Sequence, residues 1–237
     1  MRATLFQFPD SRPIVVGSFG DAASLSCATP ESIANECDIA EIRLDLFHRE
    51  IAEMGSELWG HLTSFPLLFT ARRKTEGSPF DLSSSERSAL LDTALPDSSI
   101  VDIEVISITE MSGLIGKFQS RGIPWIASYH DFDKLPTLQK LEAQAGLAKD
   151  AGAAAFKCAA QLGSIDDLTT LATFQMSEQG IPLSTMGMGT LAPVSRLLCA
   201  QAGSVLNYGF MGTRETAPGQ WSARQLREGI RSLKPIS

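Results

Sequence analysis

Eight short apolar segments rich in β-branched residues recur along the 237-residue chain, and segments of helical character lie between them. Short runs of this kind are typical of strands, whereas longer stretches with apolar residues three and four apart are typical of helices. Helices are expected at residues 83–95, 135–150, 165–178 and 194–203, the first with Ser83 and Glu86 as a capping box. The expected strands are residues 14–18, 39–44, 67–72, 99–104, 124–129, 153–157, 181–186 and 204–208.

Strands that alternate with helices predict a parallel α/β sheet. Two architectures fit eight such repeats, a (β/α)8 TIM barrel and a doubly wound open sheet, and the number and spacing of the strands do not separate them. No linker rich in Pro, Gly or Ser divides the chain, and barrels of about 250 residues fold as one domain. We therefore expect a single (β/α)8 barrel over residues 1–237.

The composition argues against several classes of protein. The net charge is −7 and the longest basic cluster is Arg72-Arg73-Lys74, so no nucleic acid is expected as a partner. The four cysteines are scattered, without a Cys-x-x-Cys pair or a histidine at ligand spacing. This pattern predicts no metal site and no disulfide framework, and it favours a reducing, cytoplasmic setting. Residues 1–10 contain no sustained apolar stretch, so neither a signal peptide nor a membrane span is expected.

Charged side chains alternate with apolar ones along several expected strands. Glu41 and Arg43 share one face of residues 39–44, and the residues between them are apolar. In an isolated strand the charged face is simply solvated. In a barrel, helices cover the outer face, so the charged face points inward, near the carboxyl end where barrel active sites lie. The same alternation recurs for Asp102 with Glu104 and for Ser128 with His130.

Lys157 is the strongest candidate for covalent chemistry. It follows Ala-Ala-Ala-Phe at the end of an expected strand, where small inward residues leave space around its side chain. Lysines are rarely buried without a partner or a purpose. Burial lowers the pKa of a lysine and leaves a free amine that can attack a carbonyl group. The alternative is a lysine that ends a strand and extends to solvent, and this segment alone favours that alternative.

His130 strengthens the case for catalysis. It directly follows the expected strand 124–129, in Ser-Tyr-His-Asp-Phe, and precedes a loop, whereas His48 and His61 lie in segments that resemble surface helices. An unperturbed imidazole titrates near neutral pH, which suits a general acid or base. A single histidine at a strand end is more often structural, but this one lies on the strand next to the lysine.

Three further charged residues follow expected strands. Arg72 shares the inward face with Thr70 and is a candidate anion or hydroxyl ligand, and Glu76 is a candidate orienting carboxylate; a solvated basic loop is the alternative. Arg196 lies near the start of a helix, where it could bind a carboxylate as a fork, or it is an ordinary surface arginine. Residues 209–220 contain glycines and a Pro-Gly pair, which is typical of a mobile loop over a barrel mouth.

Residues 187–192 match the G-x-G-x-x-[GA] fingerprint of dinucleotide-binding folds. The match lies late in the chain, and no acidic residue ends a strand about 20 residues further on, as the fingerprint requires. We therefore expect no nicotinamide cofactor, and a reductase stays a weak alternative.

Taken together, these segments resemble the type I 3-dehydroquinate dehydratases, which are Schiff-base-forming barrel enzymes. The matching stretches occur in the family's order and cover most of the chain. Each is moderately specific, and the ordered set is much more so. They are Glu41-Ile42-Arg43, Phe69-Thr70-Ala71-Arg72 with Glu76-Gly77, Asp102-Ile103-Glu104, Ser128-Tyr129-His130, Lys157, Met188-Gly189 through Ser195-Arg196, and Ala217-Pro218-Gly219-Gln220.

The resemblance implies a TIM barrel that dehydrates 3-dehydroquinate to 3-dehydroshikimate in the shikimate pathway, without a metal or dissociable cofactor. It implies that Lys157 forms an imine with the substrate ketone, that His130 is the general acid and base, and that Glu76 orients the imidazole. A homodimer is expected from this analogy alone. The substrate-binding residues that the resemblance implies are Glu41, Arg43, Arg72, Arg196, Thr216, Gln220 and, less strongly, Ser18.

Three positions depart from the family pattern: Ser78 and Ala192 replace common glycines, and Thr216 replaces a common serine. None of these changes removes a proposed catalytic group. Another Schiff-base barrel lyase or aldolase would share the lysine, and a non-catalytic binding module could share the whole barrel. The lysine, the histidine and the glutamate are all present, which argues against a non-catalytic module.

Overall fold

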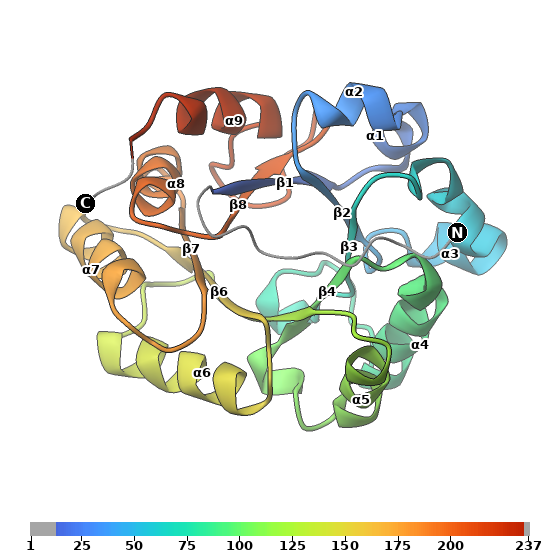
Figure 1. The fold of residues 1–237 in the computed structure, drawn as a ribbon, viewed down its shortest axis with the longest axis horizontal. Helices are drawn as coiled ribbons and strands as arrows, with labels where there is room; N and C mark the ends of the chain where they lie inside the picture. Colours follow the sequence, from blue (N-terminus) through green and yellow to red (C-terminus); the bar gives the residue numbers. More distant parts are fainter. Residues whose placement is uncertain (1–12, 235–237) are drawn as a thin grey trace.

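The computed structural model describes residues 13–234, and within them eight parallel strands form one sheet at the centre of a ring of helices (Figure 1). The sheet order is β7-β6-β5-β4-β3-β2-β1-β8, so each strand from β1 to β6 pairs with the next along the chain. The strands are β1 (Ile14–Phe19), β2 (Ile39–Arg43), β3 (Leu67–Thr70), β4 (Ile100–Glu104), β5 (Trp125–Asp131), β6 (Ala155–Gln161), β7 (Leu183–Met188) and β8 (Leu206–Phe210).

The sheet curves into a nearly closed barrel. β1 pairs with β8 in parallel, with Val16 opposite Tyr208. β7 and β8 share no ladder, but the Val205 amide donates to the Leu183 carbonyl at 2.9 Å and the Ser184 hydroxyl donates to the Leu206 carbonyl at 2.6 Å. The expected (β/α)8 TIM barrel is therefore confirmed over the described residues, and the open doubly wound sheet is excluded.

Helices cover the outside of the barrel (Figure 1). The expected capping box is confirmed at α4, where the Ser83 hydroxyl and the Glu86 side chain each accept a backbone N–H of the other residue. The helices are α1 (Ala22–Cys27), α2 (Pro30–Ala34), α3 (His48–Met54), α4 (Ser84–Ala94), α5 (Ser112–Ser120), α6 (Leu138–Asp150), α7 (Ile165–Met176), α8 (Ala192–Gln201) and α9 (Ala223–Arg231).

Strand parity divides the buried side chains into two cores. Alternate residues of β1 illustrate this, because Val15 packs with the surrounding helices while Ile14 and Val16 pack inside the barrel. By the same alternation Glu41 lies inside the barrel with Ile39. The expected inward orientation of the charged strand faces is confirmed, since Glu41, Asp102, Glu104 and Lys157 are all buried.

Two strand boundaries differ from expectation in ways that matter for the site. β3 ends at Thr70, two residues earlier than expected, so Arg72 belongs to the loop after the strand. β6 begins at Ala155 and continues to Gln161, because Ala159 and Ala160 keep pairing with β5 and β7. Lys157 is thus the third residue of its strand, and the alternative of a strand-end lysine that extends to solvent is wrong.

No helix within residues 13–234 is long and apolar enough to cross a membrane. The segment 1–10, in which no signal peptide was expected, lies outside the described residues.

Candidate active site

A pocket opens at the carboxyl ends of the strands, and all ten residues expected from the sequence to form the site line it. They come from strands β1, β2, β5 and β6, from helix α8, and from the loops after β3 and β8. The ten residues are Ser18, Glu41, Arg43, Arg72, Glu76, His130, Lys157, Arg196, Thr216 and Gln220.

Lys157 lies at the centre of this pocket and is only 4% exposed. Its Nζ donates a hydrogen bond to Asp102 Oδ2 at 3.1 Å across the barrel interior. Burial lowers the pKa of Lys157; the Asp102 carboxylate opposes this shift and the Arg72 charge adds to it. The net lowering increases the fraction of free amine, which is the nucleophilic form.

His130 lies on the neighbouring strand β5, two residues beyond the position that pairs with Lys157. β5 and β6 pair with Ser128 opposite Lys157 and His130 opposite Ala159. Burial lowers the pKa of His130 well below its usual value of 6.5, and the charges of Arg72, Lys157 and Arg43 lower it further. The imidazole is therefore neutral near pH 7 and can accept a proton.

Glu76 fixes the orientation of that imidazole. Its Oε2 lies 3.0 Å from His130 Nδ1 and accepts the His130 backbone N–H at 3.0 Å. A ring proton on Nδ1, donated to this oxygen, would leave Nε2 with a free lone pair. Burial raises the pKa of Glu76 to about 8, against the opposing Arg72 charge.

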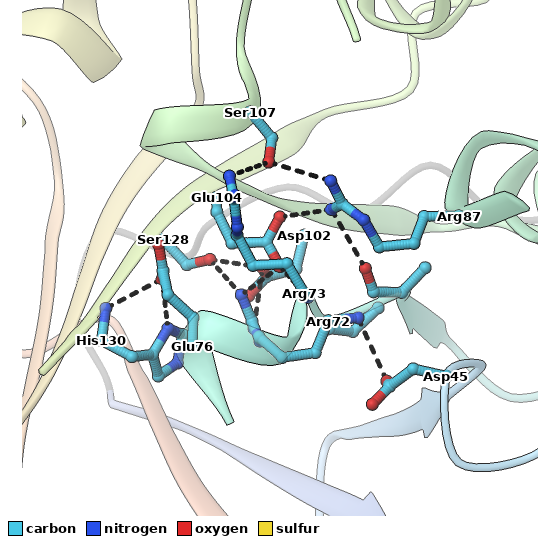
Figure 2. A network of polar contacts seen from close by, with 12 residues as sticks. Asp45, Arg72, Arg73, Glu76, Arg87, Asp102, Glu104, Ser107, Ser128 and His130 are labelled. Atoms are coloured by element: carbon cyan, nitrogen blue, oxygen red, sulfur yellow. Dashed lines mark hydrogen bonds and ion pairs between the residues drawn. The ribbon is translucent and has the colours of Figure 1, made fainter. Parts of the chain in front are cut away.

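Arg72 lines the pocket and contacts side chains of two strands, β4 and β5 (Figure 2). Its guanidinium lies 2.9 Å from Asp102 Oδ1 and 3.2 Å from Glu104 Oε1, and it donates to the Ser128 hydroxyl at 2.6 Å. Burial disfavours this cation, but Asp102 and Glu104 outweigh that effect and raise the pKa of Arg72. The charges of Arg72 and Lys157 in turn lower the pKa of Asp102 in spite of its burial. Asp102 is thus an ionised partner for the lysine.

Arg87 extends this network from outside the barrel, on helix α4 (Figure 2). Its Nη1 donates to Glu104 Oε2 at 2.8 Å and its Nη2 to Glu110 Oε1 at 2.7 Å. Arg87 is not among the residues that the sequence predicts for the site. The available signal was helical periodicity, since Arg87 lies on the same helix face as the buried Leu91 and Ala94.

Glu41 and Arg43 of strand β2 also line the pocket. Glu41 Oε1 accepts the Thr70 hydroxyl at 2.7 Å, and its Oε2 accepts the Ser18 hydroxyl. Arg43 donates twice to Asp45, at 2.9 and 2.8 Å. These contacts fix both side chains before any ligand arrives.

Arg196 is a buried cation that lacks an anionic partner among the described residues. It is 1% exposed, its Nη1 donates to the Tyr208 carbonyl at 2.6 Å and contacts Met186 Sδ at 3.4 Å, and its Nε has no hydrogen-bond partner. Burial lowers the pKa of Arg196 to about 10, so it remains charged near neutral pH. A buried charge without a counterion is costly, and this one faces a pocket that an anion can enter.

The loop after β8 covers one side of the pocket. Gln220 Oε1 accepts the Thr216 amide at 3.0 Å and its hydroxyl at 2.8 Å, and within residues 13–234 no bond occupies the Gln220 amide nitrogen. The Gly189 amide donates to the Pro218 carbonyl at 3.0 Å, and a Cβ on Gly219 would lie 2.3 Å from the Gly189 carbonyl oxygen. The missing side chain of Gly219 therefore lets this loop pack closely against Gly189 in the fingerprint-like segment 187–192.

Residues 19–237 match the model of the type I 3-dehydroquinase family. The chain belongs to that family. This membership confirms the resemblance inferred from the sequence, and it confirms an enzyme of the hydro-lyase class.

Curated relatives of this chain align with it over most of its length. A 3-dehydroquinate dehydratase of Neisseria meningitidis is 35% identical over 230 residues, covering 90% of this chain and 88% of that protein. A catabolic 3-dehydroquinate dehydratase of Acinetobacter baylyi is 31% identical over 211 residues, covering 84% of this chain and 77% of that protein. Among solved structures, the 3-dehydroquinate dehydratase of Enterococcus faecalis superposes with a TM-score of 0.82 at 23% identity, covering 96% of this chain and 97% of that one. That similarity shows the shared barrel fold.

Proposed function

We propose that this family member dehydrates 3-dehydroquinate to 3-dehydroshikimate through an imine on Lys157, with His130 as general acid and base. One observation carries the proposal. The buried Lys157 amine and the His130 imidazole, which is oriented by Glu76, lie on neighbouring strands and face the same pocket. An amine and a base in this relation suit proton abstraction next to a carbonyl carbon.

The reaction begins when the free Lys157 amine attacks the substrate ketone. The carbonyl oxygen leaves as water and a protonated imine forms. That cation acidifies the adjacent carbon, and His130 Nε2 takes one of its protons. The resulting electron pair forms an enamine and then expels the hydroxyl group on the next carbon, which leaves as water with the proton from the imidazolium. Hydrolysis of the imine consumes one water and releases the conjugated ketone, so the net reaction loses one water.

The remaining pocket residues would bind the carboxylate and ring hydroxyls of the substrate. Arg196 would bind the carboxylate, because it is a buried cation without a counterion among the described residues. Glu41, Arg43, Arg72 and Gln220 would bind hydroxyl groups and the carboxylate edge. Thr216 holds the Gln220 amide in place, and Ser18 holds Glu41.

Ultraviolet absorbance of the conjugated enone product tests this function directly. The purified protein mixed with 3-dehydroquinate should produce that absorbance, and Lys157→Ala should not. Absence of product with the wild-type protein would refute the dehydratase proposal and direct the search to other carboxylated ketones. A homodimer and a cytoplasmic location are further proposals, which sedimentation and cell fractionation test.

A further inference from the structure

Tyr208 is a pocket residue that the proposed reaction does not yet use. It lies on β8 and shares the inward face with Leu206, inside the barrel. Its side chain is 3% exposed, and its hydroxyl is buried without a hydrogen-bond partner among the described residues. Such a hydroxyl destabilises the fold relative to a phenylalanine. The hydroxyl therefore does not explain why a tyrosine occupies this position, and the contacts of the ring must be considered instead.

The ring lies against the amine that the proposed function assigns to the imine. Lys157 Nζ is 4.0 Å from the centroid of the Tyr208 ring. The same residue also contacts the proposed carboxylate ligand, since its backbone carbonyl accepts Arg196 Nη1 at 2.6 Å. Tyr208 thus touches both Lys157 and Arg196.

A cation over an aromatic ring is attracted by the negative potential of the ring face, and the attraction is larger where water is excluded. Lys157 is buried, so the ring acts on a desolvated nitrogen. Asp102 is a second group that favours a positive charge on Lys157, through its 3.1 Å hydrogen bond. A protonated imine has fewer N–H groups than an ammonium group and so can donate fewer hydrogen bonds. Its positive charge is still attracted by the face of the Tyr208 ring.

We propose that Tyr208 is a further residue of the imine site, whose ring face stabilises the positive charge on the Lys157 nitrogen, both as ammonium and as protonated imine. The inference rests on the proposed function for its catalytic consequence, because only a protonated imine draws electrons from the adjacent carbon. The ring, not the hydroxyl, carries the effect. The charged and titratable groups that also face this nitrogen are Asp102, Arg72, Glu41 and His130.

The test compares Tyr208→Leu, which removes the ring, with Tyr208→Phe, which keeps the ring and removes the hydroxyl. Competitive labelling with acetic anhydride over a range of pH, read by mass spectrometry of the peptide carrying Lys157, gives the pKa of that amine without substrate. We expect Tyr208→Leu to lower this pKa by about 1 unit, as loss of a cation–π contact implies. Tyr208→Phe should leave it unchanged and raise the melting temperature.

Turnover gives a second measurement on the same variants. Tyr208→Leu should reduce kcat by about tenfold, in proportion to the same lost contact, while Tyr208→Phe should keep nearly the wild-type kcat. Tyr208→Met, which fills more of the space of the ring, replaces Tyr208→Leu if that variant does not fold. An unchanged pKa of Lys157 without the ring, or equal shifts in the Phe and Leu variants, would overturn the inference. Failure of the wild-type protein to dehydrate 3-dehydroquinate would refute the proposed function instead, because the labelling result does not depend on substrate.

Discussion

Arg87 donates a 2.8 Å hydrogen bond to Glu104 from a helix outside the barrel, while Arg72 contacts the other oxygen of that carboxylate from inside (Figure 2). All three side chains are buried. Glu104 therefore joins the outer helix layer to the arginine that holds Asp102, the partner of Lys157. A chain of charge pairs links α4 to the amine at the centre of the pocket.

Arg87→Met should destabilise the fold strongly. The substitution leaves Glu104 with one arginine fewer in a buried setting, and removal of one partner of a buried ion pair costs about 3–5 kcal/mol. Denaturant unfolding measures the change. The matched control is Lys117→Met, which removes an exposed ion pair with Asp92 at 2.7 Å; its cost should be below about 1 kcal/mol. Equal effects of the two substitutions would contradict a structural role for the buried pair.

Arg196→Met should change binding and stability in opposite directions. Loss of the cation removes the proposed partner of the substrate carboxylate, so kcat/KM should fall by roughly 100-fold or more, as expected for truncating one side of a buried charge pair. The free protein should melt at a higher temperature, because a buried cation without a counterion among the described residues is gone. Steady-state kinetics and thermal melting measure the two effects. A lower melting temperature with unchanged KM would show that Arg196 is structural.

Glu76→Gln should affect activity mainly above pH 8. The pKa of Glu76 is raised to about 8 by burial, so below that pH the carboxyl is mostly neutral and an amide oxygen can accept the same two hydrogen bonds from His130. Above it, the wild-type carboxylate gains a charge that makes the imidazole more basic, and the variant does not. The ratio of wild-type to variant kcat/KM should therefore rise as pH increases through about 8.

Glu76→Ala is the control for this prediction. It removes the acceptor for both hydrogen bonds, so its activity should be low at every pH. A Glu76→Gln variant that is equally impaired at all pH values would show that Glu76 acts as an ionised carboxylate throughout.

The His130 imidazole should titrate below pH 6.5 in the free protein, as measured by an NMR pH titration. Burial and the neighbouring cations lower the pKa of His130, so the imidazole keeps its free lone pair until the pH falls through that lowered value. The dependence of kcat/KM on pH reports groups of the free enzyme. The free Lys157 amine is one of these groups and adds its own acid limb, so the NMR titration is what isolates His130. An imidazole that titrates at or above pH 6.5 would contradict the lowered pKa of His130.

Strand parity and the order of motifs predicted most of the barrel and ten of the residues that line the pocket. Alternation along a strand assigns Glu41 and Lys157 to the inward face directly, since the period of two does not depend on distant contacts. Strand ends were less predictable. β6 continues past Lys157 because Ala159 and Ala160 find partners on both neighbouring strands, and pairing of this kind depends on the assembled sheet.

The residues that sequence reasoning missed act through long-range contacts. Arg87 contacts Glu104 from 17 positions away along the chain, and nothing near it in sequence indicates this partner. Tyr208 ends the expected strand 204–208 and resembles an ordinary core aromatic residue in the sequence. Only the closure of the barrel brings its ring to the Lys157 nitrogen.

Covalent trapping at Lys157 tests the central claim most directly. Sodium borohydride added during turnover of 3-dehydroquinate should reduce the imine and leave an adduct on the peptide that carries Lys157, detected by mass spectrometry, with loss of activity in step with labelling. Lys157→Ala should give neither product nor adduct. Turnover without an adduct, or an adduct on a different lysine, would contradict the proposed mechanism.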